Sequence, residues 1–185
     1  LDLITAASAM PKAETIHLVE AGSQLVGLVD ALAKSLDIDG APADAVSISY
    51  GACEYEYASG TGLGPLVTLT EDLLQMAAVV GTSVVVSAGD HGTSACGGSF
   101  NDEPTVQYPA SSPWVTAVGG TRLTLKSDNT RRSEVVWNDL PFVGDEPAPG
   151  PAGAGGPSGL FARPGYQRGV TPVGPRMLPR RCPPG

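Results

Sequence analysis

The run of residues from 84 to 121 constrains the fold of this chain more than any other stretch. It opens with three valines at 84–86, too short and too β-branched for a helix, and typical of a strand buried on both faces. Small residues at 87–89 then turn the chain and leave one carboxylate, Asp90, directly after the strand. Because open α/β sheets bind ligands at the carboxyl ends of their strands, Asp90 is a candidate site residue.

Strand and helix patterns alternate around this run. Short apolar strands are predicted at 15–19, 45–49, 84–87 and 114–118, helices at 1–9, 24–36 and 66–80, and a hairpin at 122–125 and 134–137. This order indicates an α/β fold with a parallel sheet and helices on both faces. We therefore expect the strands that end at Ser49 and Ser87 to be neighbours. Gly81 should end the helix that precedes the second of them.

Composition and charge argue against two classes of partner. The formal net charge of −8 combines −13 in residues 1–158 with +5 in residues 159–185. An acidic body disfavours nucleic acid, because phosphate binding requires clustered cations. No apolar run reaches the roughly 18 residues that a membrane-spanning helix needs, so a membrane is not an expected partner.

Residues 1–167 form one predicted domain, and residues 168–185 form a tail. The 185 residues suffice for a single domain with a substantial core. The tail is rich in Pro and Arg and lacks periodicity, so we expect it to be disordered or to derive from a shifted reading frame. The chain opens at Leu1 as if inside a helix, and we expect the domain to be incomplete at both ends.

The cysteines allow one disulfide and indicate no metal site. Cys53 and Cys96 each follow a predicted strand, so a disulfide between neighbouring loops would suit a secreted protein. Two unpaired buried thiols are the alternative. There is no CxxC pair and the two histidines, His17 and His91, are isolated, which excludes a zinc site of the usual spacing.

Four motifs follow one another along the chain. They are SISYG at 47–51, SAGD at 87–90, YPASSPWVTAVGGT at 108–121 and a GGxSxxFxxPxYQ pattern at 155–167. Together they resemble the sedolisin family of serine-carboxyl peptidases, which have a subtilisin-like fold. Each motif alone is weak, but the combination is specific and covers nearly everything up to about residue 179. Subtilisins carry an Asn that hydrogen-bonds the oxyanion in this loop, and here that position is Asp90.

The resemblance implies peptide hydrolysis in acid by a Ser-Glu-Asp triad. A carboxylic acid at position 90 can donate a hydrogen bond to an oxyanion only when it is protonated. Imidazole is cationic in acid and cannot accept a proton, and sedolisins resemble subtilisins with Glu as the general base. An Asp four residues later in the same helix orients that Glu. Asp2 matches the end of the family's Glu-x-x-Leu-Asp motif and is the candidate for this role.

The resemblance also implies a substrate and a cofactor. Tyr50, Gly51, Ala88 and Gly89 are candidate backbone contacts for an extended peptide. The family binds calcium at a site that does not match any part of this chain, and its members are secreted, so we expect an extracellular protein.

The catalytic Ser and Glu of the family match no position here. The Gly-Thr-Ser sequences at 81–83 and 92–94 lie on the wrong side of the oxyanion loop for the nucleophile. We therefore expect these 185 residues to be inactive by themselves.

Two other functions stay open. A conventional subtilisin-like protease requires a catalytic His in a helix after the first strand, and neither His17 nor His91 is so placed. A non-catalytic α/β binding module would have lost the nucleophile. The sequence does not decide peptide specificity, or between internal cleavage and removal of tripeptides.

Overall fold

A three-stranded parallel sheet lies at the centre of the molecule. The computed structural model describes residues 2–22, 25–57, 62–94, 104–139, 142–143, 146–147 and 151–169. The sheet contains β1 (Ala45–Ile48), β3 (Ser83–Ser87) and β5 (Thr116–Val118) in the order β1-β3-β5. In the register, Ile48 lies beside Val86, and Val86 lies beside Ala117. The predicted parallel sheet is confirmed, with the strands that lead to Ser49 and Ser87 adjacent.

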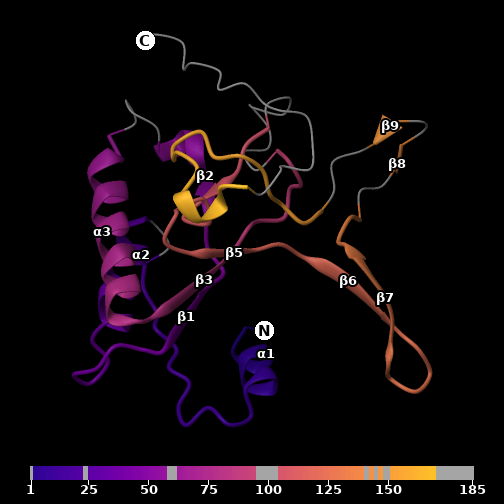
Figure 1. Cartoon of the computed structure of the whole chain (residues 1–185), viewed down its shortest axis with the longest axis horizontal. Coiled ribbons are helices and arrows are strands. Elements are labelled where there is room, and N and C mark those ends of the chain that lie inside the picture. Colours follow the sequence, from indigo (N-terminus) through magenta and orange to yellow (C-terminus); the bar gives the residue numbers. More distant parts are fainter. Residues whose placement is uncertain are drawn as a thin grey trace.

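Two helices cover one flank of this sheet. Figure 1 shows α2 (Leu25–Ser35) and α3 (Gly64–Val80) side by side, with α1 (Asp2–Ala9) apart from them on the other flank. Helix α3 carries Pro65 in its first turn and ends at Gly81, whose φ of 87° suits a residue without a side chain. The predicted stop at Gly81 is confirmed.

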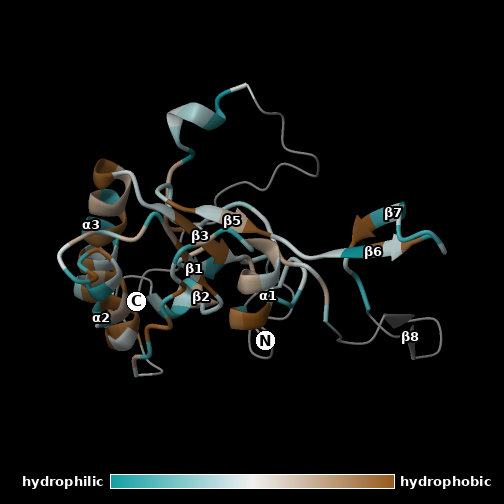
Figure 2. Ribbon diagram, turned by 90° about the horizontal axis from the view of Figure 1, so that it is seen from below, coloured by the Kyte–Doolittle hydropathy of each residue, from teal (hydrophilic) through white to brown (hydrophobic). Residues whose placement is uncertain are grey.

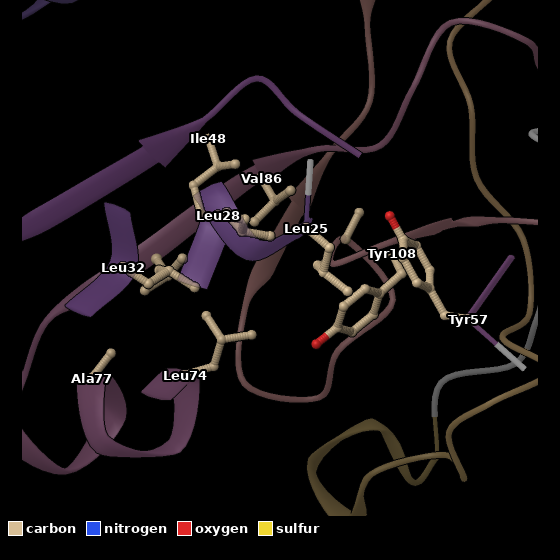
Figure 3. Packing of buried hydrophobic residues seen from close by; sticks show 11 residues of the cluster. Leu25, Leu28, Leu32, Ile48, Tyr57, Leu74, Ala77, Val86 and Tyr108 are labelled. Atoms are coloured by element: carbon tan, nitrogen blue, oxygen red, sulfur yellow. The ribbon is translucent and has the colours of Figure 1, made fainter. Parts of the chain in front are cut away.

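The core forms where α2 and α3 meet the sheet. Leucines of α2 pack against side chains of α3, β1 and β3, as Figure 3 shows: Leu25, Leu28, Leu32, Leu74, Ala77, Ile48 and Val86. Tyr57 and Tyr108 extend this cluster with an edge-to-face contact at 5.3 Å between ring centroids. Phe161 stacks on Tyr108 at 5.9 Å and so attaches the C-terminal part of the domain to the core.

Short elements complete the carboxyl edge of the sheet. Strand β2 (Ala52–Cys53) pairs antiparallel with β4 (Gln107–Tyr108) and continues into the 3₁₀ helix η1 (Glu54–Tyr57). The sequence did not predict β2 or β4, because two residues are too few to show a period. A second 3₁₀ helix, η3, spans Gly165–Gln167.

The predicted hairpin is confirmed and extends away from the sheet. Figures 1 and 2 show β6 (Thr121–Leu125) and β7 (Arg131–Val136) reaching outward beyond β5. All residues of both strands are exposed. A smaller pair, β8 (Phe142–Val143) with β9 (Glu146–Pro147), follows.

One predicted strand is wrong. Residues 15–19 adopt neither helix nor strand, and Ile16 and Leu18 are 37% and 66% exposed. Their alternating apolar pattern suits a strand, but a strand forms only beside a partner edge, and the structure pairs residues 15–19 with none of the residues it describes. Helix α1, on the other side of the sheet in Figure 1, has no buried residue. Most of the predicted tail, from residue 170 onward, lies outside the described residues.

In the part of the chain that the structure describes, no helix is both long and apolar enough to cross a membrane.

Candidate active site

A pocket of about 250 Å³ opens at the carboxyl edge of β1 and β3. Its lining comes from the segments that leave these two strands and from β4: Ser49, Tyr50, Gly51, Ser87, Gly89, Asp90, His91 and Gln107. The carboxyl ends of adjacent parallel strands are where α/β sheets bind ligands. Four of the six predicted catalytic and substrate-binding residues, Tyr50, Gly51, Gly89 and Asp90, thus line one pocket.

Two walls face each other in this pocket, with a glycine in each. Gly89 adopts a φ of 108°, which side chains rarely tolerate, and a Cβ there would lie 2.7 Å from Cδ of Gln107. A Cβ on Gly51 would lie 3.0 Å from Oε1 of Gln107. The Gln107 side chain therefore occupies space that both glycines leave open. Sequence reasoning missed Gln107, whose only signal is its place directly before the Tyr108 motif.

Asp90 lies exposed at the rim on a fixed backbone. Its carbonyl oxygen accepts a hydrogen bond from the Ala152 amide at 2.8 Å. The carbonyl of the preceding Gly89 accepts from the Ala154 amide at 3.0 Å. The loop is thus held by residues some 60 positions later, while the carboxyl group is accessible to a ligand.

Two other predicted residues lie outside the lining. Ala88 is buried, and its amide donates to the Val118 carbonyl at 2.9 Å, so it supports the wall from behind. Asp2 is the first residue of α1, where its side chain is exposed. The structure does not bring Asp2 into the pocket, and its role in orienting a base stays a prediction.

Cys53 supports the Tyr50–Gly51 wall. It is buried and disulfide-bonded, which excludes a free thiol at this position. Its predicted partner, Cys96, lies outside the described residues, so the pairing stays a prediction.

Glu54 is a buried carboxylate that sequence reasoning missed. Its side chain is only 3% exposed, yet it accepts a short hydrogen bond from the Ser158 hydroxyl and a second, at 2.7 Å, from the Gly159 amide. A buried carboxylate requires such partners to offset the loss of hydration. No pattern in the sequence connects Glu54 with a serine 104 positions away.

A second acid, Glu71, is partly buried and contacts the core residue Tyr108. Glu71 of α3 accepts hydrogen bonds from the Tyr108 hydroxyl and the Ser112 hydroxyl, each at 3.0 Å. Burial raises the pKa of Glu71 above its ordinary value, although the two hydroxyls act in the opposite direction. Burial likewise raises the pKa of Tyr108, with the neighbouring Glu71 adding to the shift.

Among the residues that the structure describes, no group of three His, Cys, Asp or Glu side chains is placed to hold a metal ion.

Several known proteins are similar to this chain in sequence, and a solved structure is similar to it in fold. No family model matches it. Kumamolisin of Bacillus sp. (strain MN-32) is 35% identical over 122 residues, which are 66% of this chain and 19% of that protein. Sedolisin of Pseudomonas sp. (strain 101) is 36% identical over 143 residues, 74% of this chain and 23% of that protein. The solved structure of Pseudomonas sedolisin, a serine-carboxyl proteinase complexed with pseudo-iodotyrostatin, superposes with a TM-score of 0.66 and 28% identity.

The chain belongs to the sedolisin family. Its parallel sheet and flanking helices are accordingly those of a subtilisin-like fold. The matched region covers 82% of this chain and 40% of the solved sedolisin chain. The chain spans about a fifth of the length of the curated relatives, which include tripeptidyl-peptidase sed5 of Aspergillus fumigatus, 39% identical over 102 residues.

Proposed function

We propose that this chain is part of a serine-type peptidase that hydrolyses peptide bonds in acid, with Asp90 as the oxyanion-stabilising acid. The observation that carries this proposal is the pocket at the carboxyl edge of β1 and β3, where Asp90 meets Tyr50 and Gly51. A fixed backbone with an exposed carboxyl group suits a hydrogen-bond donor aimed at a developing charge.

The proposed chemistry requires Asp90 in its protonated form. A carboxylate beside an oxyanion would repel it, whereas a carboxylic acid donates a hydrogen bond to it. In acid a Glu is still able to accept the proton of a nucleophilic Ser, which an imidazolium is not. We assign Asp2 the role of orienting that Glu. The Ser and the Glu are supplied by other parts of a full-length protein, so these 185 residues should bind peptides without cleaving them.

The proposed substrate is a peptide in extended conformation. Its backbone would run along the rim of the pocket, beside the backbones of Tyr50, Gly51, Ala88 and Gly89, since extended peptides bind through main-chain hydrogen bonds along such edges. The names of the relatives include both sedolisin and tripeptidyl-peptidase, and either internal cleavage or removal of tripeptides is compatible with this pocket.

Secretion and calcium complete the proposal. We place the protein outside the cell by analogy with the family. Calcium would be bound by parts of a full-length protein other than the residues described here, which offer no cluster of ligands.

The pH dependence of peptide cleavage by the full-length protein tests the proposal. Hydrolysis of a denatured protein substrate should be greatest in acid and decline toward neutral pH. Activity that rises toward neutral pH would favour a conventional subtilisin-like protease with a His base. Peptide binding without cleavage at any pH would favour a non-catalytic α/β binding module.

A further inference from the structure

Residues 152–161, here called the strap, contact the Gly89–Asp90 wall of the pocket at one end and Glu54, beside the opposite wall, at the other. The strap contains no charged residue and four glycines, at 153, 155, 156 and 159. The structure shows the strap without a helix or extended strand. Its ends nevertheless make specific bonds, which indicates a role in holding other parts together.

The first end of the strap pairs with the Asp90 wall. The amides of Ala152 and Ala154 donate to the carbonyls of Asp90 and Gly89, and the Gly92 amide donates back to the Ala152 carbonyl at 3.1 Å. Both alanines are less than 9% exposed. Between them, a Cβ on Gly153 would lie 3.0 Å from the Gly120 carbonyl oxygen, so this close approach favours glycine.

The second end of the strap is fixed by Glu54. The Ser158 hydroxyl oxygen accepts hydrogen bonds from the Leu160 amide at 3.1 Å and the Phe161 amide at 2.9 Å. With both lone pairs occupied, its O–H donates to the buried Glu54 carboxylate. The second oxygen of Glu54 accepts from the Gly159 amide.

Glu54 adjoins the opposite wall through the β2–β4 pair. Its amide donates to the Val106 carbonyl at 3.1 Å. It directly follows Cys53, which pairs with Gln107, the residue whose side chain lies between the two walls. The strap thus connects Gly89–Asp90 at one end with the β2–β4 pair at the other.

We propose that Glu54 is a positioning residue, which fixes the strap through Ser158 and thereby the separation of the two pocket walls. An amide at position 54 would not replace it. Its oxygen would serve the Gly159 amide, but its NH₂ group would face a Ser158 oxygen whose lone pairs are already used. That a peptide occupies the pocket rests on the proposed function, whereas the mechanical link does not.

Amide hydrogen exchange of the 185-residue chain tests the link at a distance from the altered residue. In Ser158→Ala and in Glu54→Gln, the amides of Gly92, Ala152 and Ala154 should exchange at least about tenfold faster, because releasing one end of the strap loosens the other. Ser158→Thr keeps the hydroxyl and should restore slow exchange. Tyr166→Phe is the matched control, since it removes only the bond from the Tyr166 hydroxyl to the Pro113 carbonyl.

The proposal predicts that loosening one end of the strap also loosens the other. Faster exchange restricted to residues 159–161, with Gly92, Ala152 and Ala154 unchanged, would overturn the proposal. If a variant does not fold, exchange of the unaltered chain in increasing low urea gives the same answer. Both ends of the strap should then open with one shared dependence on urea, and independent opening of the two ends would equally overturn it.

Cleavage by the full-length protein separates this inference from the proposed function. Faster exchange at Ala152 and Ala154 in a protein that cleaves no peptide would support the link and reject the peptidase. In an active protein, Glu54→Gln should raise KM more than it lowers kcat, because a displaced wall weakens peptide binding.

Discussion

The two halves of this molecule bury their apolar side chains very differently. In the half built from α2, α3 and the β1–β3 pair, Leu32, Leu74 and Val86 are at most 1% exposed. In the β6–β7 hairpin, Leu123 and Val136 are 54% and 71% exposed, although the two strands pair along their length with one register shift between Thr124 and Leu125. Figure 2 colours parts of the hairpin ribbon as hydrophobic, at a distance from the three-stranded sheet.

The contrast shows that backbone pairing and core formation are separate contributions to this fold. The hairpin has paired strands and a local turn, but within the described residues its apolar side chains have no layer above them. In the α2–α3 half, the β1–β3 pair has fewer paired residues than the hairpin, yet the side chains around it form a closed core. Stability should therefore reside in the α2–α3 half, which also carries the strands that form the pocket.

The largest expected difference comes from removing a leucine in each half. Leu74→Ala should lower the free energy of unfolding by about 2–5 kcal/mol, because it leaves a cavity between α2 and α3. Leu123→Ala in the hairpin should change it by no more than about 0.5 kcal/mol. Urea denaturation followed by circular dichroism measures both. Equal losses in the two variants would break the comparison.

A smaller effect is expected from Glu71 in the α2–α3 half, which should make the free energy of unfolding depend on pH. Burial raises the pKa of this carboxyl in the folded state above the 4.5 of an ordinary Glu. Because the folded state then holds its proton more tightly than the unfolded state, Glu71 costs stability as the pH rises from 4.5 through the raised value. The unaltered chain should therefore lose stability relative to Glu71→Gln between acid and neutral pH. A relative gain over that range, measured by urea midpoints, would contradict this sign.

The smallest effect is expected at the hairpin turn and has the opposite sign. Hydrogen bonds from the Thr130 hydroxyl and amide, at 2.6 and 3.0 Å, lower the pKa of Asp128 below the ordinary 3.8. The stabilisation of the turn by the Asp128 carboxylate is present above the ordinary pKa of 3.8, and it is lost as the pH falls through the lowered pKa. In Asp128→Asn, the Thr130 amide should exchange faster than in the unaltered chain at pH 5. A difference that persists unchanged below pH 2 would show that the charge is not the cause.

Local patterns in the sequence were sufficient to predict the central elements. Valines at 84–86 and the apolar run at 45–49 predicted adjacent strands, and Gly81 predicted a helix end, because each signal is contained within a few residues. The expected burial on both faces is wrong, since β3 alternates between buried and partly buried residues and only Ile48 of β1 is buried. Residues 15–19 carried the same kind of signal, yet they form no strand. An alternating apolar pattern indicates that a segment is able to form a strand. It does not indicate whether a partner strand is present beside it.

The site residues that lie within sequence motifs were predictable. Asp90, Tyr50 and Gly51 came from the motifs and converge on one pocket. Glu54 and Gln107 were missed because their roles depend on contacts with Ser158 and with two glycines far away in the sequence. Such pairings between loops leave no periodic trace and become visible only in three dimensions.

The central claim is that Asp90 acts as a protonated hydrogen-bond donor, and the pH profile of Asp90→Asn in the full-length protein tests it most directly. An amide donates at any pH, so the dependence on a protonated acid at this site should disappear. We expect kcat/KM in acid to fall by about ten- to a thousandfold, or, where the amide substitutes well, its decline toward neutral pH to move to higher pH. Asp30→Asn on the exposed face of α2 is the matched control. Unchanged activity with an unchanged pH profile in Asp90→Asn would contradict the account.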